Sequence, residues 1–190
     1  MSPEKLTPEE RQSLLLLARH SIDAAVKREP LPAIEEEKLT EALRTNGATF
    51  VTLTIGGELR GCVGALQAYQ PLAYDVQEHA VAAALEDFRF PPVSKSELPH
   101  LEIEISRLTP PKRLEYSTPA DLPGLLRVGS DGVILQDGVR RATFLPQVWE
   151  KVPEPEDFLS ELCAKMGARG GLWREKKLEV WIYEVEEFHE

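Results

Sequence analysis

The sequence has only two cysteines and no long run of apolar residues. Cys62 and Cys163 are too few for a disulfide framework, so we expect the chain to work in a reducing cytoplasm. A membrane-spanning helix needs about 18 apolar residues in a row, and no segment approaches that length. The apolar run Leu14–Leu17 is short and follows the charged stretch Glu9–Arg11, which is unlike a secretory leader.

Basic residues are also scarce. The 22 lysines and arginines are outnumbered by 32 aspartates and glutamates, which gives a formal net charge of −10. Binding of DNA or RNA needs a basic face, and the longest basic cluster, at 174–177, is too small to supply one. The motifs HExxH, CxxC, the P-loop and a strand-linked GxGxxG are absent as well. We therefore expect no nucleic-acid partner, and the sequence assigns no metal or cofactor.

Helix signals occur at four places in the chain. The clearest begins at Thr7, where Pro8 and Glu10 complete a capping box, and it runs to Pro30. Shorter apolar stripes of helical spacing predict the other helices, at about 35–44, from Pro71 to just before Pro91, and at 155–166.

Strand signals fill most of the remaining sequence. Gly56-Gly57 predicts a hairpin turn, and residues 101–108 alternate between apolar and polar. The predicted strands are 49–55, 58–66, 101–108, 125–128, 133–136, 139–144 and 178–185. Hairpins outnumber βαβ units, which predicts an α+β fold with a mainly antiparallel sheet. No linker interrupts the chain, so we expect one domain over 1–190, with 1–47 as a candidate N-terminal helical portion.

The stretch Leu59–Gly64 is the first candidate site. Strands usually avoid glycine, so Gly61 and Gly64 indicate a bulge or a close approach by a ligand or another backbone. Arg60 and Cys62 are two residues apart and share a face in a regular strand. A guanidinium beside a thiol favours the nucleophilic thiolate. The alternative is that Cys62 is a small buried apolar residue and Arg60 a structural ion-pair donor.

The second candidate site is the end of the third predicted helix. Glu86, Asp87 and Arg89, held by Pro91-Pro92, would present carboxylates and a guanidinium to a pocket. Equally, Asp87 and Arg89 would pair with each other and hold the turn, and the residues alone favour this second interpretation. On the same helix, His79 lies one turn after Asp75, and we favour a solvated polar face there over a metal site.

These two stretches also carry a resemblance to a known family. Leu59–Gly64 resembles the LRGCIG signature of the AMMECR family, and Ala82–Pro92 resembles its AA…DPRFPP segment. The match runs from Ala48 onward and continues in Leu101–Pro110, Gly138–Val148, and Leu162–Gly167 followed by Trp173. The sequence departs from the family pattern at Val63, Ala65 and Phe88, where Ile, Thr and Pro are common.

The resemblance implies two similar β-rich repeats around one barrel-like sheet with flanking helices. It also implies association with a Memo-like protein and a radical-SAM protein, the AmmeMemoRadiSam set, and it supplies no established activity. A dimer through the hairpin edge at 139–144 is compatible with the sequence.

Three hypotheses about function follow from these residues. The favoured one is a binding or accessory module that takes a small anion or a partner protein in a cleft beside Arg60 and Cys62. In that module Gly61, Gly64, Glu86 and Arg89 would complete the binding site. The alternative is a thiol-dependent enzyme or enzyme component, with Cys62 as nucleophile and Asp87 as a proton-handling carboxylate. The third is a redox or metal-delivery accessory to the radical-SAM protein.

Overall fold

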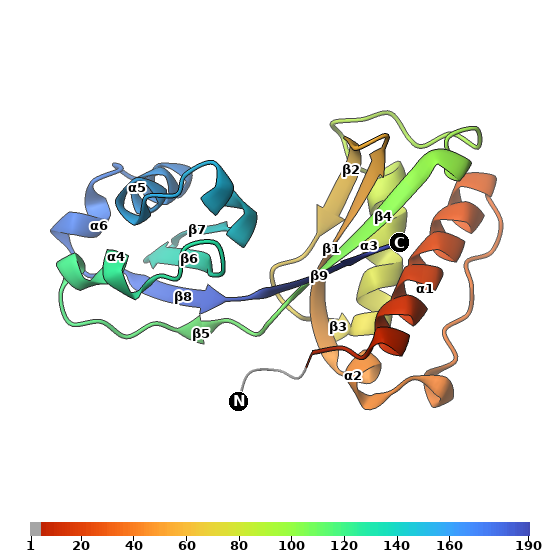
Figure 1. The fold of residues 1–190 in the computed structure, drawn as a ribbon, viewed down its shortest axis with the longest axis horizontal. Coiled ribbons are helices and arrows are strands. Elements are labelled where there is room, and N and C mark those ends of the chain that lie inside the picture. Colours follow the sequence, from red (N-terminus) through yellow and green to blue (C-terminus); the bar gives the residue numbers. More distant parts are fainter. Residues whose placement is uncertain (1–4) are drawn as a thin grey trace. The chain divides into compact units, whose positions relative to one another are not determined.

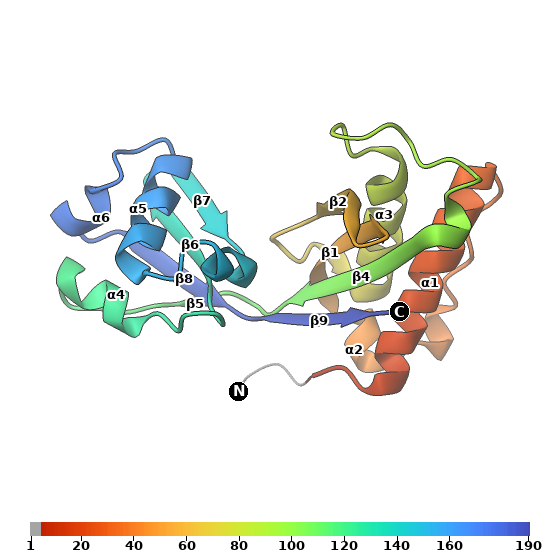
Figure 2. The same ribbon diagram turned by 45° about the horizontal axis from the view of Figure 1, so that its top comes forward.

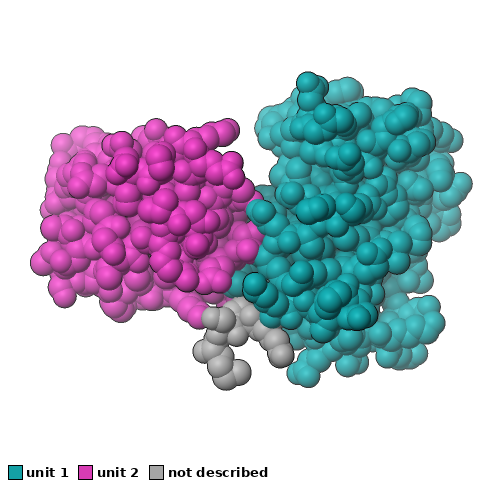
Figure 3. All heavy atoms as spheres, viewed as in Figure 1, with its two compact units in different colours: residues 1–109, 186–190 teal, residues 110–185 magenta. Residues whose placement is uncertain are grey.

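The structure, a computed structural model, describes residues 5–190 and divides into two compact units. Unit 1 contains the chain up to Thr109 together with Glu186–Glu190, and unit 2 contains Pro110–Val185 (Figure 3). Each unit has its own sheet and its own apolar core. That residues 1–190 act as one domain stays a prediction, and the predicted helical portion 1–47 supplies the first two α-helices of unit 1 in the described part of the chain.

Unit 1 is a sheet with two long helices on one face (Figures 1 and 2). Its helices are α1 (Pro8–Lys27), η1 (Glu36–Lys38), α2 (Glu41–Arg44), α3 (Leu72–Leu85) and η2 (Leu98–His100). Its strands are β1 (Asn46–Ile55), β2 (Glu58–Gly64), β3 (Gln70–Pro71), β4 (Leu101–Leu108) and β9 (Val185–His189). They follow the order β2-β1-β4-β9, and β3 pairs with the start of β1. The faces of α1 and α3 bury their apolar stripes against β1 and β4.

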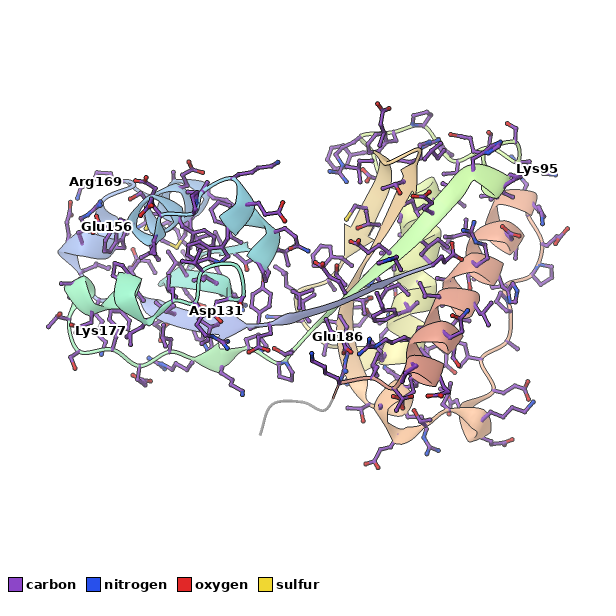
Figure 4. All side chains as sticks on the ribbon, in the orientation of Figure 1. Lys95, Asp131, Glu156, Arg169, Lys177 and Glu186 are labelled. Carbon is purple, nitrogen blue, oxygen red and sulfur yellow. The ribbon has the colours of Figure 1, made fainter. Side chains whose placement is uncertain are left out.

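The first helix forms where its capping box predicts. The Thr7 hydroxyl accepts the Glu10 amide at 3.2 Å, and the Glu10 carboxylate accepts the Thr7 amide at 2.8 Å. Glu186 of β9, labelled in Figure 4, then fixes this end of the helix by accepting the Leu6 amide and pairing with Arg11.

The second predicted helix, 35–44, is wrong as a single element. Leu39 and Thr40 are extended, with ψ of 141° and 165°, and they separate η1 from α2. The Thr40 hydroxyl donates to the Glu10 carboxylate at 2.5 Å, so a tertiary hydrogen bond replaces the helical continuation.

Unit 2 is a second antiparallel sheet packed against helices. Its strands are β5 (Lys112–Arg113), β6 (Gly132–Asp137), β7 (Arg140–Phe144) and β8 (Glu179–Tyr183), in the order β5-β8-β6-β7. Its helices are η3 (Pro119–Asp121), α4 (Leu122–Leu125), η4 (Pro146–Glu150), α5 (Pro155–Lys165) and α6 (Leu172–Glu175). Phe158 of α5 lies at the centre of the core and stacks on Trp149 with ring centroids 3.7 Å apart.

Two strand predictions in this region are wrong. The predicted strand 125–128 is the end of α4 followed by a turn, in which the buried carboxylate of Asp131 (labelled in Figure 4) accepts the amide and the guanidinium of Arg127. The predicted strand 178–185 ends at Tyr183, and the chain then enters the other sheet as β9. Each error arises because pairing with another strand, which a local pattern does not report, decides where a strand begins and ends.

The predicted fold class is confirmed as α+β with antiparallel sheets. The barrel-like closure that the resemblance implied is wrong, because the two sheets are separate and neither closes on itself. Six α-helices rather than about four occur in residues 5–190. Within that range no helix combines the length and the apolarity that crossing a membrane requires.

Candidate functional site

The candidate site is built on β2, an edge strand of the unit 1 sheet. The two-residue turn pairs Ile55 with Glu58 and Thr54 with Leu59, and this register would place Cys62 opposite Val51 in the core. The register instead shifts by one residue, so Leu53 pairs with Gly61. Arg60 is the extra residue of this β-bulge.

The bulge decides the environment of Cys62. Because the shift moves Cys62 opposite Thr52, its side chain lies on the sheet face away from the helices. The Thr52 hydroxyl lies 3.2 Å from the Cys62 sulfur, and the thiol is partly exposed. The alternative that Cys62 is a small buried apolar residue is therefore wrong, but its second half, Arg60 as a structural ion-pair donor, is confirmed by the pair with Glu97. The predicted bulge is confirmed.

Gly61 is required by the helix behind the strand. A Cβ built on Gly61 would lie 2.1 Å from the carbonyl oxygen of Ala83, near the end of α3. A Cβ on Gly64 would lie 2.3 Å from the carbonyl oxygen of Thr49. Both glycines thus permit close backbone approach, as their position in a strand predicts.

Asp87 and Arg89 cap the open edge of β2 at Cys62. The Asp87 carboxylate accepts the Cys62 amide at 2.8 Å, and Nη2 of Arg89 donates to the Cys62 carbonyl at 3.2 Å. These two backbone groups point away from β1, because Cys62 and Thr52 form a non-hydrogen-bonded pair in the ladder. The two side chains therefore take the place that a neighbouring strand would occupy.

The same two residues form a forked ion pair. Nε and Nη2 of Arg89 donate to the two carboxylate oxygens of Asp87 at 2.9 and 2.6 Å. The Arg89 hydrogen bonds, with the amides of Cys62 and Arg89, hold the pKa of Asp87 well below its usual range, although burial opposes this. The Asp87 hydrogen bond raises the pKa of Arg89, and the charge of Asp87 adds to the rise. The predicted pairing of Asp87 with Arg89 is confirmed.

Arg60 has a different carboxylate partner. Its Nε donates to Glu97 at 2.7 Å, and only 13% of its side chain is exposed. The Arg60 hydrogen bond, with those of Ser94, lowers the pKa of Glu97 to about 2. The guanidiniums of Arg60 and Arg89 lie 5.9 and 5.6 Å from the ring centroid of Phe90.

The structure thus brings the two candidate stretches together, but their side chains pair with other residues than the sequence predicted. The bulge interrupts the regular alternation that put Arg60 beside Cys62, and the guanidinium that binds Cys62, through its carbonyl oxygen at 3.2 Å, is that of Arg89. Glu86 ends α3 with an exposed side chain that makes no hydrogen bond or ion pair within the described part of the chain. The roles predicted for these residues stay predictions.

Three residues of the site were missed by sequence reasoning. Thr52 takes its place only through the bulge, and Phe90 only through the two guanidiniums around it. Glu97 had a usable signal, because Ser94-x-x-Glu97 is a capping-box pattern, and the Ser94 amide does donate to Glu97 at 2.8 Å.

The polar pair on α3 is not the solvated face that the sequence predicted. Asp75 and His79 are buried, and the Asp75 carboxylate accepts the amide and hydroxyl of Thr49 at 2.8 and 2.6 Å and contacts Nδ1 of His79 at 3.1 Å. The pair therefore fastens α3 to β1. Across residues 5–190 the structure shows no group of three or more His, Cys, Asp or Glu placed to hold a metal.

Fold and site together define an α+β chain of two sheet-and-helix units, with a cysteine on a bulged edge strand capped by an aspartate–arginine pair. The AMMECR1 family model matches residues 15–188, and the chain belongs to this family.

Relatives of known sequence or structure extend along nearly the whole chain. A protein of Methanothermobacter thermautotrophicus is 37% identical over 97% of this chain and 96% of its own length. A protein of Methanopyrus kandleri is 37% identical over 98% of this chain and 91% of its own length. The crystal structure of an uncharacterized protein from Pyrococcus horikoshii is similar with a TM-score of 0.85 at 32% identity, covering 98% of this chain and 94% of that one.

Proposed function

We propose that this chain is a binding module, and that the turn after α3 docks a partner protein beside Cys62. The observation that carries the proposal is Phe88, whose side chain is 96% exposed. It stands between Asp87 and Arg89, which are anchored to β2, so an apolar ring projects from a fixed turn. Aromatic and arginine side chains supply most hot spots of protein interfaces.

Arg89 supports recognition of an anionic group on that partner. Its side chain is 45% exposed, and Nη1 makes no hydrogen bond with the residues that the structure describes. A carboxylate or phosphate would therefore find one free edge of a guanidinium whose position is already fixed by Asp87. Arg60, by contrast, gives Nε and Nη2 to Glu97 and is mostly buried.

The state of Asp87 supports binding over proton transfer. Its side chain is 4% exposed, and its pKa is held well below the usual range by Arg89. A general base works best with a pKa near the working pH. Asp87 therefore serves to hold Arg89 and the β2 edge in place.

The Memo-like and radical-SAM proteins that the family resemblance implies are the partners we propose, in a reducing cytoplasm suited to the free thiols of Cys62 and Cys163. The test measures binding of each purified partner by calorimetry. Phe88→Ala is expected to weaken binding about tenfold or more, because it removes a ring without disturbing the core. Val139→Ala, at a fully exposed valine of unit 2, is the matched control. Equal affinity for wild type and Phe88→Ala would refute the proposed docking site.

The position of Arg89, whose guanidinium is held at Cys62 by a hydrogen bond to the Cys62 carbonyl at 3.2 Å, favours one second candidate, a thiol-dependent enzyme or enzyme component. A guanidinium stabilises the thiolate, which is the nucleophilic form. Iodoacetamide should then alkylate Cys62 faster than a free model thiol, and Arg89→Gln should slow the reaction. A rate at or below that of the model thiol rules out Cys62 as an activated nucleophile.

A further inference from the structure

A pocket of about 340 Å³ lies in unit 1, on the part of α1 that precedes its midpoint. The residues that line it belong to α1, to the segment that leads from Ala33 to α2, and to the first turn of α3. Figure 1 shows where these elements lie in unit 1. This volume is at the lower end of the range for small-molecule sites. None of the residues of the Cys62 site lines it.

The inner wall of the pocket is apolar. Leu14, Leu43 and Ala73 are buried and belong to the core of unit 1. Leu17 and Leu39 pack against that core and remain partly exposed toward the opening. An aliphatic or aromatic group placed here would cover the apolar surface that Leu17 and Leu39 still expose, and would bury its own.

Carboxylates give the rim of the pocket a negative charge. Glu10 accepts the Thr7 amide and the Thr40 hydroxyl, and the Thr40 hydrogen bond is the largest cause of its lowered pKa. Glu35 pairs with Lys38 at 2.6 Å, and those two charges cancel. Glu9 makes no ion pair with any residue in the described range. Among the lining residues, Glu9 and Glu10 therefore leave a net charge of −2, while the charge of Arg107, outside the lining, acts on Glu10.

We propose that this pocket binds a small amine, that is, a ligand with an apolar body and one cationic head. The body would rest on Leu17 and Leu39, and the ammonium group would face Glu9 and Glu10. Charge complementarity selects this class, because a carboxylate of equal size would meet two like charges at the rim. The proposal is independent of the docking site at Phe88.

The probes are hexylamine, hexan-1-ol and hexanoate, which share one apolar chain and differ in charge. Binding is followed by amide chemical shifts of the intact chain, with Ser13 and Leu17 as reporters on α1. Hexylamine should bind at least about tenfold more tightly than hexanoate, and the difference should shrink as salt is raised. Equal binding of the three probes would refute the charge selection, and no shift with hexylamine at millimolar concentration would refute the site.

Two variants and one control locate the ligand. Ala33→Trp fills the pocket from its exposed wall and should abolish binding, while Leu16→Trp places the same ring on α1 outside the pocket and should leave binding unchanged. Glu9→Gln keeps the shape of the rim, and the loss of one exposed charge should weaken hexylamine binding about two- to fivefold. Normal binding by folded Ala33→Trp, checked by circular dichroism, would refute this location.

Discussion

Replacing Asp87 with alanine removes the acceptor of four hydrogen bonds, two from amides and two from the Arg89 guanidinium. The side chain is 4% exposed, so the Cys62 amide loses its partner in a place that water reaches poorly. A hydrogen bond to a charged group contributes about 1.5–3 kcal/mol. Arg89 is 45% exposed and regains water, so its share is about 1 kcal/mol or less. We expect Asp87→Ala to lower the free energy of unfolding by about 2–4 kcal/mol.

Two further variants separate the loss of the Asp87 charge from the loss of its hydrogen-bond acceptor and supply a control. Asp87→Asn keeps an oxygen for the Cys62 amide and loses the charge, so we expect about half the destabilisation. Asp23→Ala removes an exposed i,i+4 pair with Lys27 and should change stability by less than about 0.5 kcal/mol. The measurement is urea denaturation at pH 7, with the m-value checked for constancy. If Asp87→Ala and Asp23→Ala gave the same midpoint, the capping role of Asp87 would be refuted.

The contribution of Asp87 to the free energy of unfolding should fall as the pH is lowered. The folded pKa of Asp87 lies below its reference value of 3.8, so the stabilisation is fully present above about pH 4 and is lost as the pH falls toward the folded pKa. The stability difference between wild type and Asp87→Asn should therefore be constant from pH 5 to pH 8 and shrink in acid.

Asp87→Ala also uncovers the β2 edge, so it should self-associate more than wild type when size is measured by light scattering.

Three other predictions concern other positions in unit 1. Gly61→Ala should cost about 3 kcal/mol in urea denaturation, because its Cβ would meet a backbone oxygen that cannot rotate away, and a cost below about 1 kcal/mol would contradict the close approach. Glu97→Gln should lower the free energy of unfolding by about 1 kcal/mol at pH 7 and leave it unchanged below about pH 2. The reason is that the pKa of Glu97 is about 2 in the folded protein and 4.5 in the reference state. A loss of stability that did not depend on pH would contradict the ion pair with Arg60. Arg28→Gly should raise the melting temperature slightly, because Arg28 ends α1 with φ of 62°, and a lower melting temperature would contradict strain at that residue.

Features that depend on neighbouring residues were predictable. The capping box at Thr7 and Glu10 starts α1, Gly56-Gly57 turns the first hairpin, and the alternation at 101–108 matches β4. In each case the hydrogen bonds or the buried face are set by residues a few positions apart. The glycine pattern also located the bulge, although it left the side of the strand undecided.

Which guanidinium lies at Cys62 was decided by tertiary structure. Alternation in a regular strand assigns Arg60 to Cys62, but the one-residue shift turns Cys62 to the face shared with Thr52 and sends Arg60 to Glu97. Arg89 reaches the same cysteine only because α3 returns its end to the edge of β2. Sequence spacing carries no information about contacts between residues 27 positions apart.

The sequence by itself determined the α+β class, most of the helix and strand positions, and the two stretches that form the candidate site. Tertiary structure alone decided the division into two sheets, the break between η1 and α2, and the transfer from β8 to β9. The physical reason is the range of the interactions involved. Caps, turns and amphipathic stripes act within a few residues, whereas strand register and the capping of a sheet edge depend on which distant segment arrives beside them.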